Sequence, residues 1–482
     1  MRRLAFPLLV LLTVAGACGS NDKTACDPAA QTGCASGLFC EAVQNGTPAC
    51  FAPVLVRGTV SDPTTKPAAL LLNDARVVAL DANRAPLSTV AVTANDGTTN
   101  GAYELKVRAT RDSSGKPVQA SFTLRADKQG YQAFPGGIRT ALPIDLSSAT
   151  LTSGSWIVSG PLTTVQLLPL TGGGTAFVHG TVAKPSSGAG TLVVAEPAAG
   201  GAGLTGIADD SGSYAIYNLA PGTQYVITAY AKSVNYVPVT TAALAPGDNT
   251  VSTLALGSGT GATVTGGLIF NNGVTDPVAV ALVVESTYDP ILDRGETPPG
   301  LAVQSAASGY SFTNVPDGKY IVLAAFDADG NVRDVSCPSP PCTNNTQPVV
   351  VIVQGGSAGA VGQFKITRAI SGLTIAGATP TVAPMVVSTS TPVFTWTKAN
   401  AYSSAQTYRV TVYDSTGNVA WTVDQPGGNS NSVTPPGGTI VAGDLYQLRI
   451  AAFANVTIPV DPTLRNQLSQ TEDVLGVFTY QP

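Results

Sequence analysis

The sequence predicts an all-β protein made of tandem β-sandwich domains that follow a small disulfide-rich segment. The chain has 482 residues, with 51 glycines and 35 prolines, and it is 44% hydrophobic but only 11% charged. This composition favours short strands joined by turns over a disordered chain. The body of the chain also repeats a strand-and-turn pattern three times, and no segment has the spacing of an amphipathic helix.

The N-terminal end has the plan of a bacterial lipoprotein signal. Arg2 and Arg3 precede an apolar run over 4–14, and small residues then lead to Cys18. The run is too short to cross a bilayer, so residues 1–17 are predicted to be a signal peptide that is removed. We expect Cys18 to carry lipid that attaches the protein to a membrane. An ordinary secretory signal cut after Ala17 is the alternative.

The predicted anchor places the protein in the cell envelope. An aspartate after the lipidated cysteine would retain a lipoprotein at the inner membrane, but this position holds Gly19. The outer membrane of a Gram-negative bacterium is therefore favoured. The net charge of −5 at pH 7 comes without a basic stripe that could neutralise phosphates, so nucleic acid is not an expected partner.

Six cysteines follow the predicted lipid site, and residues 18–53 are expected to form a lipid tether and a Cys-rich segment. An even number of cysteines in an oxidising compartment favours disulfides, here three. The candidates are Cys26, Cys34, Cys40, Cys50, Cys337 and Cys342. The first four allow three connectivities, which the sequence does not distinguish. A metal site is the weaker interpretation of these four, because they contain no tight C-x-x-C pair.

Three repeats define the body of the chain. Each begins with a strand that contains a V-x-G motif, at 56–60, 178–182 and 264–268. A second apolar strand follows at 75–81, 190–196 and 278–285, and then a glycine-tyrosine strand at 101–105, 212–216 and 309–312. Because side chains alternate along a strand, Tyr214 and Ile216 should share one face. The Pro221-Gly222 and Asp317-Gly318 turns should return the chain antiparallel.

These repeats resemble the carboxypeptidase regulatory-like domain. The second copy carries the resemblance through Asp210, Gly212, Tyr214, Asn218, Leu219, Pro221, Gly222 and Tyr225, and the third through Gly309, Tyr310, Asn314, Val315, Gly318 and Tyr320. The first copy keeps Gly101 and Tyr103 but diverges after them. The resemblance implies three transthyretin-like sandwiches of about seven strands each, over 54–172, 173–259 and 260–371. In relatives such modules serve as spacers, adhesive units or companions of other domains.

The last segment, 372–482, resembles a fibronectin type III domain. Its P-x-F-x-W opening at 392–396, the alternating strand at 405–414 and the strand at 446–450 fit strands B, C and F of that sandwich. Trp396 is therefore expected in the core and not on a ligand-binding surface.

No catalytic constellation stands out, and the protein is not expected to be an enzyme. The single histidine, His179, lies within an opening strand, where an ordinary strand residue is the favoured interpretation. The segment 355–359 matches the G-x-S-x-G expression around Ser357. A nucleophile elbow, however, needs a strand before it, a helix after it and a histidine further along the chain.

One acidic cluster has the oxygen-rich composition that calcium prefers, so a structural calcium ion is the one cofactor considered. Its candidate ligands are Asp327, Asp329, Asn331 and Asp334, and a second acidic loop covers 288–296 in the same repeat. The pattern lacks the glutamate at the twelfth position of an EF-hand loop. An Asp-Gly hairpin turn with solvated charges is the favoured alternative.

Two functions fit these observations. The first is a lipid-anchored, non-catalytic structural, adhesive or protein-binding module, with sandwiches stacked end to end into a rod and contacts made by loops at their tips. The alternative is carbohydrate binding, because starch-binding-like sandwiches share this fold. Sugar sites need exposed aromatic rings, for which Trp156 and Tyr236 are the candidates. The expected partner is accordingly a protein in the first case and a polysaccharide in the second.

Overall fold

Strands form nearly all the regular structure of this chain. The computed structural model describes residues 26–28, 31–65, 68–82, 84–118, 120–183, 190–209, 211–270, 278–290, 292, 294–324, 331–333, 349–397, 407–426, 430–453, 467–471 and 474–482. Within these ranges the only helical elements are three 3-10 turns, η1 (Leu146–Ser148), η2 (Pro161–Thr163) and η3 (Glu285–Thr287). The predicted all-β class with tandem sandwiches is confirmed. No described helix is long and apolar enough to cross a membrane.

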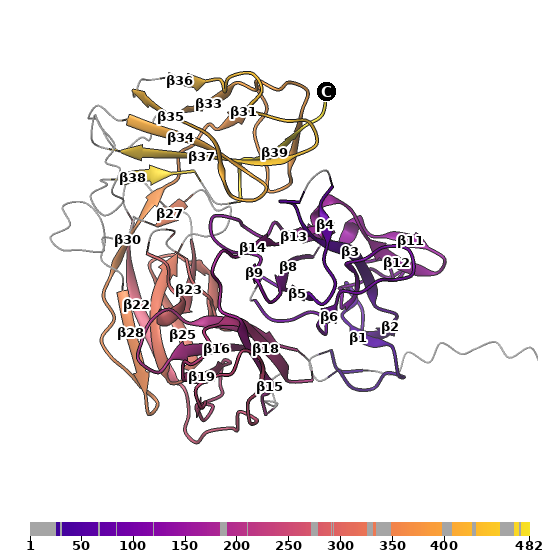
Figure 1. Ribbon diagram of the computed structural model, residues 1–482, viewed down its shortest axis with the longest axis vertical. Coiled ribbons are helices and arrows are strands. Elements are labelled where there is room, and N and C mark those ends of the chain that lie inside the picture. The colour runs from indigo at the N-terminus through magenta and orange to yellow at the C-terminus, as the bar shows by residue number, and fades with distance from the viewer. Residues whose placement is uncertain are drawn as a thin grey trace, which may run out of the picture.

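A small hairpin precedes the sandwiches. Strands β1 (Phe39–Glu41) and β2 (Ala49–Phe51) pair antiparallel, with Cys40 opposite Cys50. We call residues 26–52 the knob, and it lies beside the first sandwich (Figure 1).

The first sandwich is built around its long opening strand. The strands are β3 (Val54–Asp62), β4 (Leu70–Leu71), β5 (Arg76–Leu80), β6 (Ala91–Val92), β7 (Ala102–Val107), β8 (Ser121–Asp127), β9 (Tyr131–Gln132), β10 (Ile144–Asp145), β11 (Thr150–Thr152), β12 (Ser155–Val158), β13 (Val165–Gln166) and β14 (Leu168–Pro169). In one sheet β3 pairs antiparallel with β7 and parallel with β12 and β13. The opposite sheet has the order β10-β8-β5-β6.

The second sandwich repeats this plan with fewer strands. They are β15 (Ala176–Thr181), β16 (Thr191–Pro197), β17 (Leu204–Ala208), β18 (Ser213–Leu219), β19 (Tyr225–Tyr230), β20 (Val239–Thr240) and β21 (Gly247–Thr250). The opening strand β15 pairs antiparallel with β18 and parallel with β21. The other sheet has the order β17-β16-β19-β20. Tyr214 and Ile216 both lie in the core of this sandwich, as their spacing predicts.

The third sandwich has the same connectivity. Its strands are β22 (Ala262–Phe270), β23 (Val278–Val284), β24 (Ala302–Ala306), β25 (Gly309–Val315), β26 (Gly318–Ala324), β27 (Asn331–Arg333), β28 (Val349–Gln354), β29 (Ser357–Ala358) and β30 (Phe364–Arg368). Here β22 pairs antiparallel with β25 and parallel with β30. The three repeats are therefore one topology used three times.

The glycine and the tyrosine that recur in each repeat are cross-strand partners. The register places Gly58 opposite Tyr103, Gly180 opposite Tyr214 and Gly266 opposite Tyr310. Each tyrosine is buried. A Cβ atom on Gly180 would lie 2.8 Å from the Tyr214 hydroxyl, so the ring occupies the space that any other side chain would need. This explains why both residues recur in each repeat.

The turns after the tyrosine strands do not form hairpins, so that part of the expectation was wrong. Strands β18 and β19 belong to opposite sheets, as do β25 and β26. Asn218 and Asn314 adopt positive φ angles of 65° and 57° beside a shift in strand register. Asparagine tolerates this left-handed conformation, and the bulge turns the chain across the sandwich edge.

The fourth sandwich follows the predicted fibronectin type III-like plan. Its strands are β31 (Thr374–Ile375), β32 (Met385–Val387), β33 (Phe394–Thr397), β34 (Thr407–Asp414), β35 (Val419–Pro426), β36 (Ser430–Val433), β37 (Leu445–Phe453), β38 (Gln467–Gln470) and β39 (Val477–Tyr480). A sheet of order β31-β33-β36 accompanies one of order β32-β39-β37-β34-β35. The predicted strands B, C and F correspond to β33, β34 and β37. Trp396 is buried against Tyr408, as expected.

The sandwiches are not stacked end to end, which corrects the expected rod. Figure 1 shows the fourth sandwich above a cluster of the other three. One hydrophobic core contains Val78 and Leu80 of the first sandwich, Leu192 and Val194 of the second, and much of the third. Strands β5 and β16 are apolar on both faces, so one row of side chains fills each strand's own core and the other row fills the shared core. The first three sandwiches therefore form one body.

Candidate functional site

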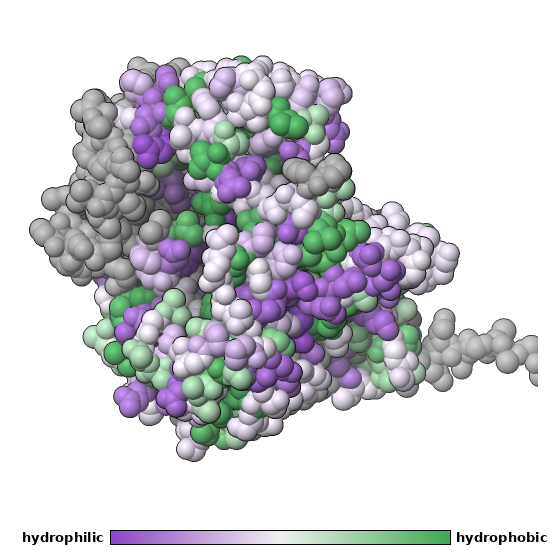
Figure 2. All heavy atoms as spheres, viewed as in Figure 1, coloured by the Kyte–Doolittle hydropathy of each residue, from purple (hydrophilic) through white to green (hydrophobic). Residues whose placement is uncertain are grey.

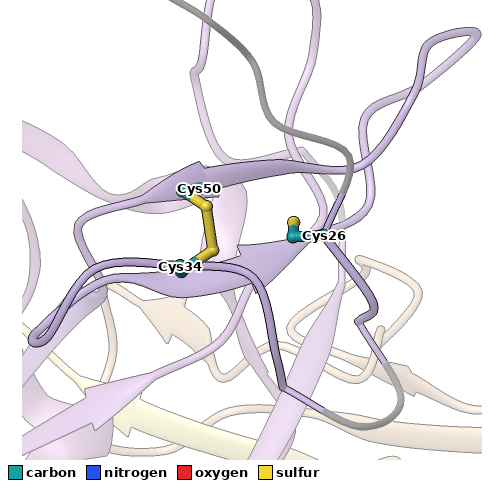
Figure 3. Close-up of side chains that lie close together, drawn as sticks. All are labelled: Cys26, Cys34 and Cys50. Carbon is teal, nitrogen blue, oxygen red and sulfur yellow. A yellow bond between two sulfur atoms is a disulfide. The ribbon is translucent and has the colours of Figure 1, made fainter.

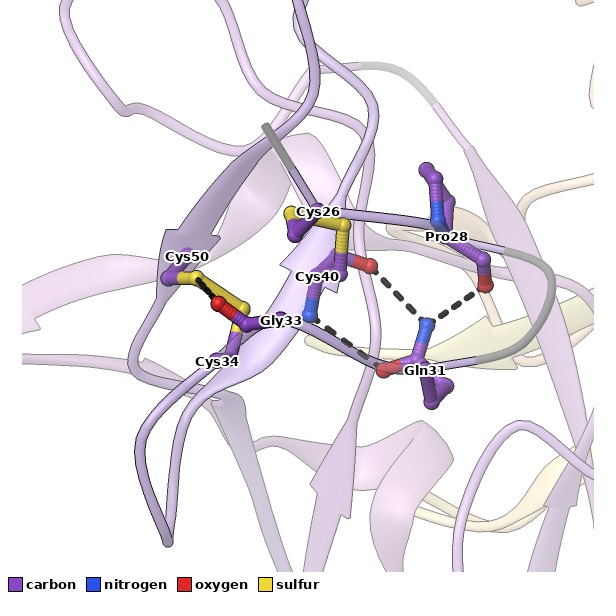
Figure 4. Close-up of a disulfide and its surroundings, with 7 residues drawn as sticks. All are labelled: Cys26, Pro28, Gln31, Gly33, Cys34, Cys40 and Cys50. Atoms are coloured by element: carbon purple, nitrogen blue, oxygen red, sulfur yellow. Dashed lines mark hydrogen bonds between the residues drawn. A yellow bond between two sulfur atoms is a disulfide. The ribbon is translucent and has the colours of Figure 1, made fainter. Parts of the chain in front are cut away.

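Two disulfides hold the knob together. They join Cys26 to Cys40 and Cys34 to Cys50, which selects one of the three connectivities (Figure 4). Figure 3 shows how close three of the cysteines lie, with their sulfur atoms within 4.8 Å of one another. All four sulfurs are used in disulfides, so this cluster offers no thiolate to a metal.

Gln31 closes the segment between the disulfides. Its side-chain amide donates to the backbone oxygens of Pro28 (2.6 Å) and Cys40 (2.9 Å), and its oxygen accepts from the Cys40 N–H (3.2 Å; Figure 4). These contacts order a segment that is too short to build a hydrophobic core of its own.

A buried ion pair joins the knob to the first sandwich. Glu41 of the knob binds the Arg111 guanidinium, and the two side chains are 0% and 1% exposed. Arg111 also donates to the Ala52 backbone oxygen (2.8 Å), and Glu41 accepts from the Ala109 N–H (2.8 Å). The Arg111 guanidinium lies over the ring of Phe51, 5.2 Å from its centroid. Burial raises the pKa of Glu41, while Arg111 opposes that rise.

Several predicted site residues lie outside the described part of the chain. They are Cys18, Cys337, Cys342, Asp327, Asp329 and Asp334. Of the predicted calcium ligands only Asn331 falls in a strand, β27, and its side chain is not described. The lipid site, the third disulfide and the calcium site therefore stay predictions.

His179 and Ser357 lie in strands of different sandwiches. The His179 Nδ1 atom is 2.6 Å from an Asp248 carboxylate oxygen on neighbouring β21, and both side chains are about half exposed. Ser357 begins the short strand β29, which pairs back onto β28. The local structure around Ser357 is thus strand, turn and strand, which is not the strand-to-helix context of a nucleophile elbow.

The two aromatic residues considered for sugar binding differ in their surroundings. Tyr236 is buried in the core of the second sandwich, and its hydroxyl donates to the Ala183 backbone oxygen (3.1 Å). Its ring face is therefore not free to stack on a sugar. Trp156 lies on β12 and packs, partly buried, against the core of the first sandwich.

The acidic loop over 288–296 makes contacts between sandwiches. Glu296 forms an ion pair with Arg125 of the first sandwich, with 2.9 Å between Glu296 Oε1 and Arg125 Nη1. Arg125 also donates two hydrogen bonds to the Asp127 carboxylate (2.9 and 3.0 Å). The same guanidinium donates to the Thr205 hydroxyl of the second sandwich (3.0 Å). We call these four residues the Arg125 clamp, because they join three sandwiches. Burial raises the pKa of Glu296, but the positive charges of Arg125 and Arg84, together with the hydrogen bonds from Arg125 and Thr205, outweigh burial and lower the pKa.

Two further polar contacts hold neighbouring sandwiches. Arg294 donates to the backbone oxygens of Gly137 and Ile138 (3.1 Å each) and to the Thr140 hydroxyl (2.8 Å). Asn218, the bulge residue of the second repeat, accepts from the Gly130 N–H (2.7 Å) and donates to the oxygen of Tyr131 (2.8 Å). The repeat motif thus supplies a contact between sandwiches as well as a turn.

A cavity of about 410 Å³ lies between the first and fourth sandwiches, and we call it the junction cavity. The first sandwich contributes Phe134, Arg139, Thr140, Ala141, Leu142, Leu162 and Gln166, and the fourth contributes Asp414, Asp444, Leu445, Tyr446, Gln447, Val477 and Thr479, among others. Arg139 is 7% exposed, and its Nη1 donates to the Gln166 backbone oxygen. Its Nε and Nη2 atoms are buried without a hydrogen-bond partner.

The residue types of the loop that carries Arg139 gave no motif from which to predict this cavity. The loop follows β9 and includes a cis bond between Phe134 and Pro135. A glycine-rich stretch with a single arginine is common in surface turns, so only the tertiary structure shows that the arginine is buried. The volume falls within the range of small-molecule sites.

Comparisons with known proteins add little to this description. No family model matches the chain, and no curated protein matches it. Similar solved structures include the FN1–FN3 domains of chicken CNTN1 (11% identity, 60% of this chain and 91% of that chain, TM-score 0.17). A DUF3823 family protein from Parabacteroides merdae aligns at 12% identity (46% and 100% of the chains, TM-score 0.22).

A tetra-tandem repeat from the extending region of a large adhesion protein aligns at 15% identity, over 89% of this chain and 98% of that chain, with a TM-score of 0.14. Scores this low carry no conclusion about this protein. The fold assignment therefore rests on the strand pairing and the cores described above.

Proposed function

We propose that this protein is a lipid-anchored component of the bacterial cell envelope that acts as a non-catalytic structural or adhesive module. The lipobox ending at Cys18 motivates the anchor and the envelope location. The three related repeats resemble, by their motif, the carboxypeptidase regulatory-like domain, whose modules commonly act as spacers or adhesive units. This finer assignment rests on the sequence pattern.

The observation that carries the proposal is the joining of the sandwiches. A shared core and the Arg125 clamp hold the first three together, and a buried ion pair holds the disulfide knob against the first. Such a body presents loops in fixed relative positions, as a binding or scaffolding surface requires. On the face in Figure 2, hydrophobic and hydrophilic residues are interspersed.

Carbohydrate binding has less support as an alternative. Tyr236 is buried, and Trp156 packs partly against a core. Binding of a polysaccharide on a glycan array that is lost in Trp156→Ala, with the fold intact, would favour this alternative over the proposal.

The anchor is tested by following the protein in its bacterial host. We expect a palmitate analogue to label the wild-type protein and the membrane fraction to contain it. Cys18→Ser should abolish the label and release the protein from the outer membrane. Gly19→Asp is the matched control, because it should keep the label but move the protein to the inner membrane. Membrane attachment unchanged by Cys18→Ser would reject the proposal.

A further inference from the structure

We propose that the junction cavity binds a small molecule in which a carboxylate is attached to an apolar body, and that Arg139 pairs with the carboxylate. This site is independent of the proposed anchor. It assigns the cavity a ligand class that neither the repeat motif nor the fold implies.

The unpaired atoms of Arg139 are the first observation behind this proposal. Nε and Nη2 lie on one edge of the guanidinium, and both are buried without a partner. Leaving a buried charged donor unsatisfied is unfavourable, so such a group indicates a missing acceptor. The remaining Nη1 donates to the Gln166 backbone oxygen. The centroid of the Phe134 ring lies 5.4 Å from the guanidinium carbon.

Other arginines in the chain show what this edge binds. Arg125 uses Nε and Nη2 to hold the two oxygens of Asp127, at 2.9 and 3.0 Å. Arg409 holds Asp424 in the same way, at 2.8 and 2.9 Å. The fork geometry of this edge matches a carboxylate with two parallel hydrogen bonds. A carboxylate is therefore the group that best supplies hydrogen-bond acceptors to Nε and Nη2 of Arg139.

The aspartates on the cavity wall do not complete this pair. The Asp414 Oδ1 atom accepts from the N–H groups of Thr416 (2.9 Å) and Asn418 (3.0 Å), which holds the carboxylate in its own turn. Among the described residues no ion pair joins Arg139 to Asp414 or to Asp444. Neither wall aspartate therefore supplies the carboxylate that Arg139 lacks.

The rest of the wall fits an apolar body. Leu142 and Leu162 of the first sandwich and Leu445 and Val477 of the fourth line the cavity with Arg139. The volume of about 410 Å³ exceeds that of a simple anion and accommodates an aromatic or aliphatic acid. Burial lowers the pKa of Arg139 to about 10, so the guanidinium still carries its charge at neutral pH.

Isothermal titration calorimetry of the purified full-length protein tests the site with 3-phenylpropanoate. We expect one saturable site, with the neutral 3-phenylpropanamide bound about tenfold or more weakly, because a charge-assisted pair is lost. Arg139→Met should abolish this preference. Arg57→Met is the matched control, since Arg57 is an exposed arginine of the same sandwich, and it should leave binding unchanged.

Two further measurements keep the test decisive if Arg139→Met does not fold. Thr164→Trp places a large ring at an exposed position on the cavity wall, and it should weaken the binding of both ligands by reducing the space in the cavity. Binding of the acid should stay constant from neutral pH upward and fall as the pH passes about 10. The absence of saturable binding, equal affinity for acid and amide, or full affinity in Arg139→Met would each overturn the proposal.

Discussion

Removal of the Glu41 carboxylate should detach the knob from the first sandwich. In Glu41→Ala the Arg111 guanidinium, 1% exposed, would keep its backbone acceptors but lose its counter-charge. Breaking a buried ion pair from one side costs about 3–5 kcal/mol, because it leaves an uncompensated buried charge. The Ala109 N–H would lose its acceptor as well. We expect the contact between knob and sandwich to open in the native protein.

Native-state hydrogen exchange measures this opening at the amides that join the two parts. The Gln44 N–H donates to the Arg111 oxygen and the Arg111 N–H to the Ala42 oxygen, at 2.8 and 2.9 Å. A loss of about 3–5 kcal/mol lowers their protection by roughly 10²–10⁴-fold. A local readout is needed because a chain of several domains has no single free energy of unfolding.

A matched exposed pair in the same sandwich provides the control. Arg57 and Glu104 form a 2.8 Å ion pair with 51% and 39% of their side chains exposed. Glu104→Ala should cost about 1 kcal/mol or less. The double variant Glu41→Leu/Arg111→Met should recover most of the lost protection, because it leaves no buried charge. If Glu41→Ala changes protection no more than Glu104→Ala does, the reasoning is refuted.

Three other perturbations test the repeat motif and the contacts between sandwiches. Gly180→Ala should lower the local stability of the second sandwich by about 1–3 kcal/mol, measured by hydrogen exchange of its strands, whereas Gly359→Ala, at an open position of the third sandwich, should change exchange in that sandwich little. Asn218→Gly keeps the left-handed backbone but loses the side-chain contacts to the first sandwich. Hydrogen exchange at the Gly130 amide should therefore rise while the second sandwich stays folded. Unchanged exchange at this amide would contradict the role of Asn218 as a contact between sandwiches. Because the pKa of Glu296 is lowered, its stabilising contribution is present above pH ~4.5 and is lost as the pH falls below that value. The radius of gyration from X-ray scattering should therefore rise in acid, as the clamped sandwiches separate. Arg125→Met should show the same rise already at neutral pH. An Arg125→Met variant as compact as the wild-type protein would argue against the clamp.

The sequence was sufficient to predict the strands and the sandwiches, because these depend on local patterns. The V-x-G opening and the later tyrosine recur together since Gly180 and Tyr214 face each other across a strand pair. The role of Asn218 was not predictable in the same way. A Pro-Gly turn after a strand usually indicates a hairpin, and only the left-handed asparagine before it shows that the chain crosses to the other sheet.

The packing of the sandwiches against one another is visible in the sequence only as apolar runs, which do not say what the strands pack against. The runs Val77–Leu80 and Leu192–Ala195 are apolar without alternation, which indicates strands buried on both faces. Which partner covers the second face depends on the tertiary structure. The junction cavity could not be predicted, because the sequence does not distinguish a buried, unpaired arginine from an exposed one.

Small-angle X-ray scattering of the purified protein tests most directly whether the sandwiches form one body. A compact chain of this length has a radius of gyration of about 23 Å, whereas four sandwiches of about 100 residues in a line would give about 40 Å. The account predicts a value close to the first figure in the wild-type protein at neutral pH. A value close to the second would contradict the shared core and the Arg125 clamp.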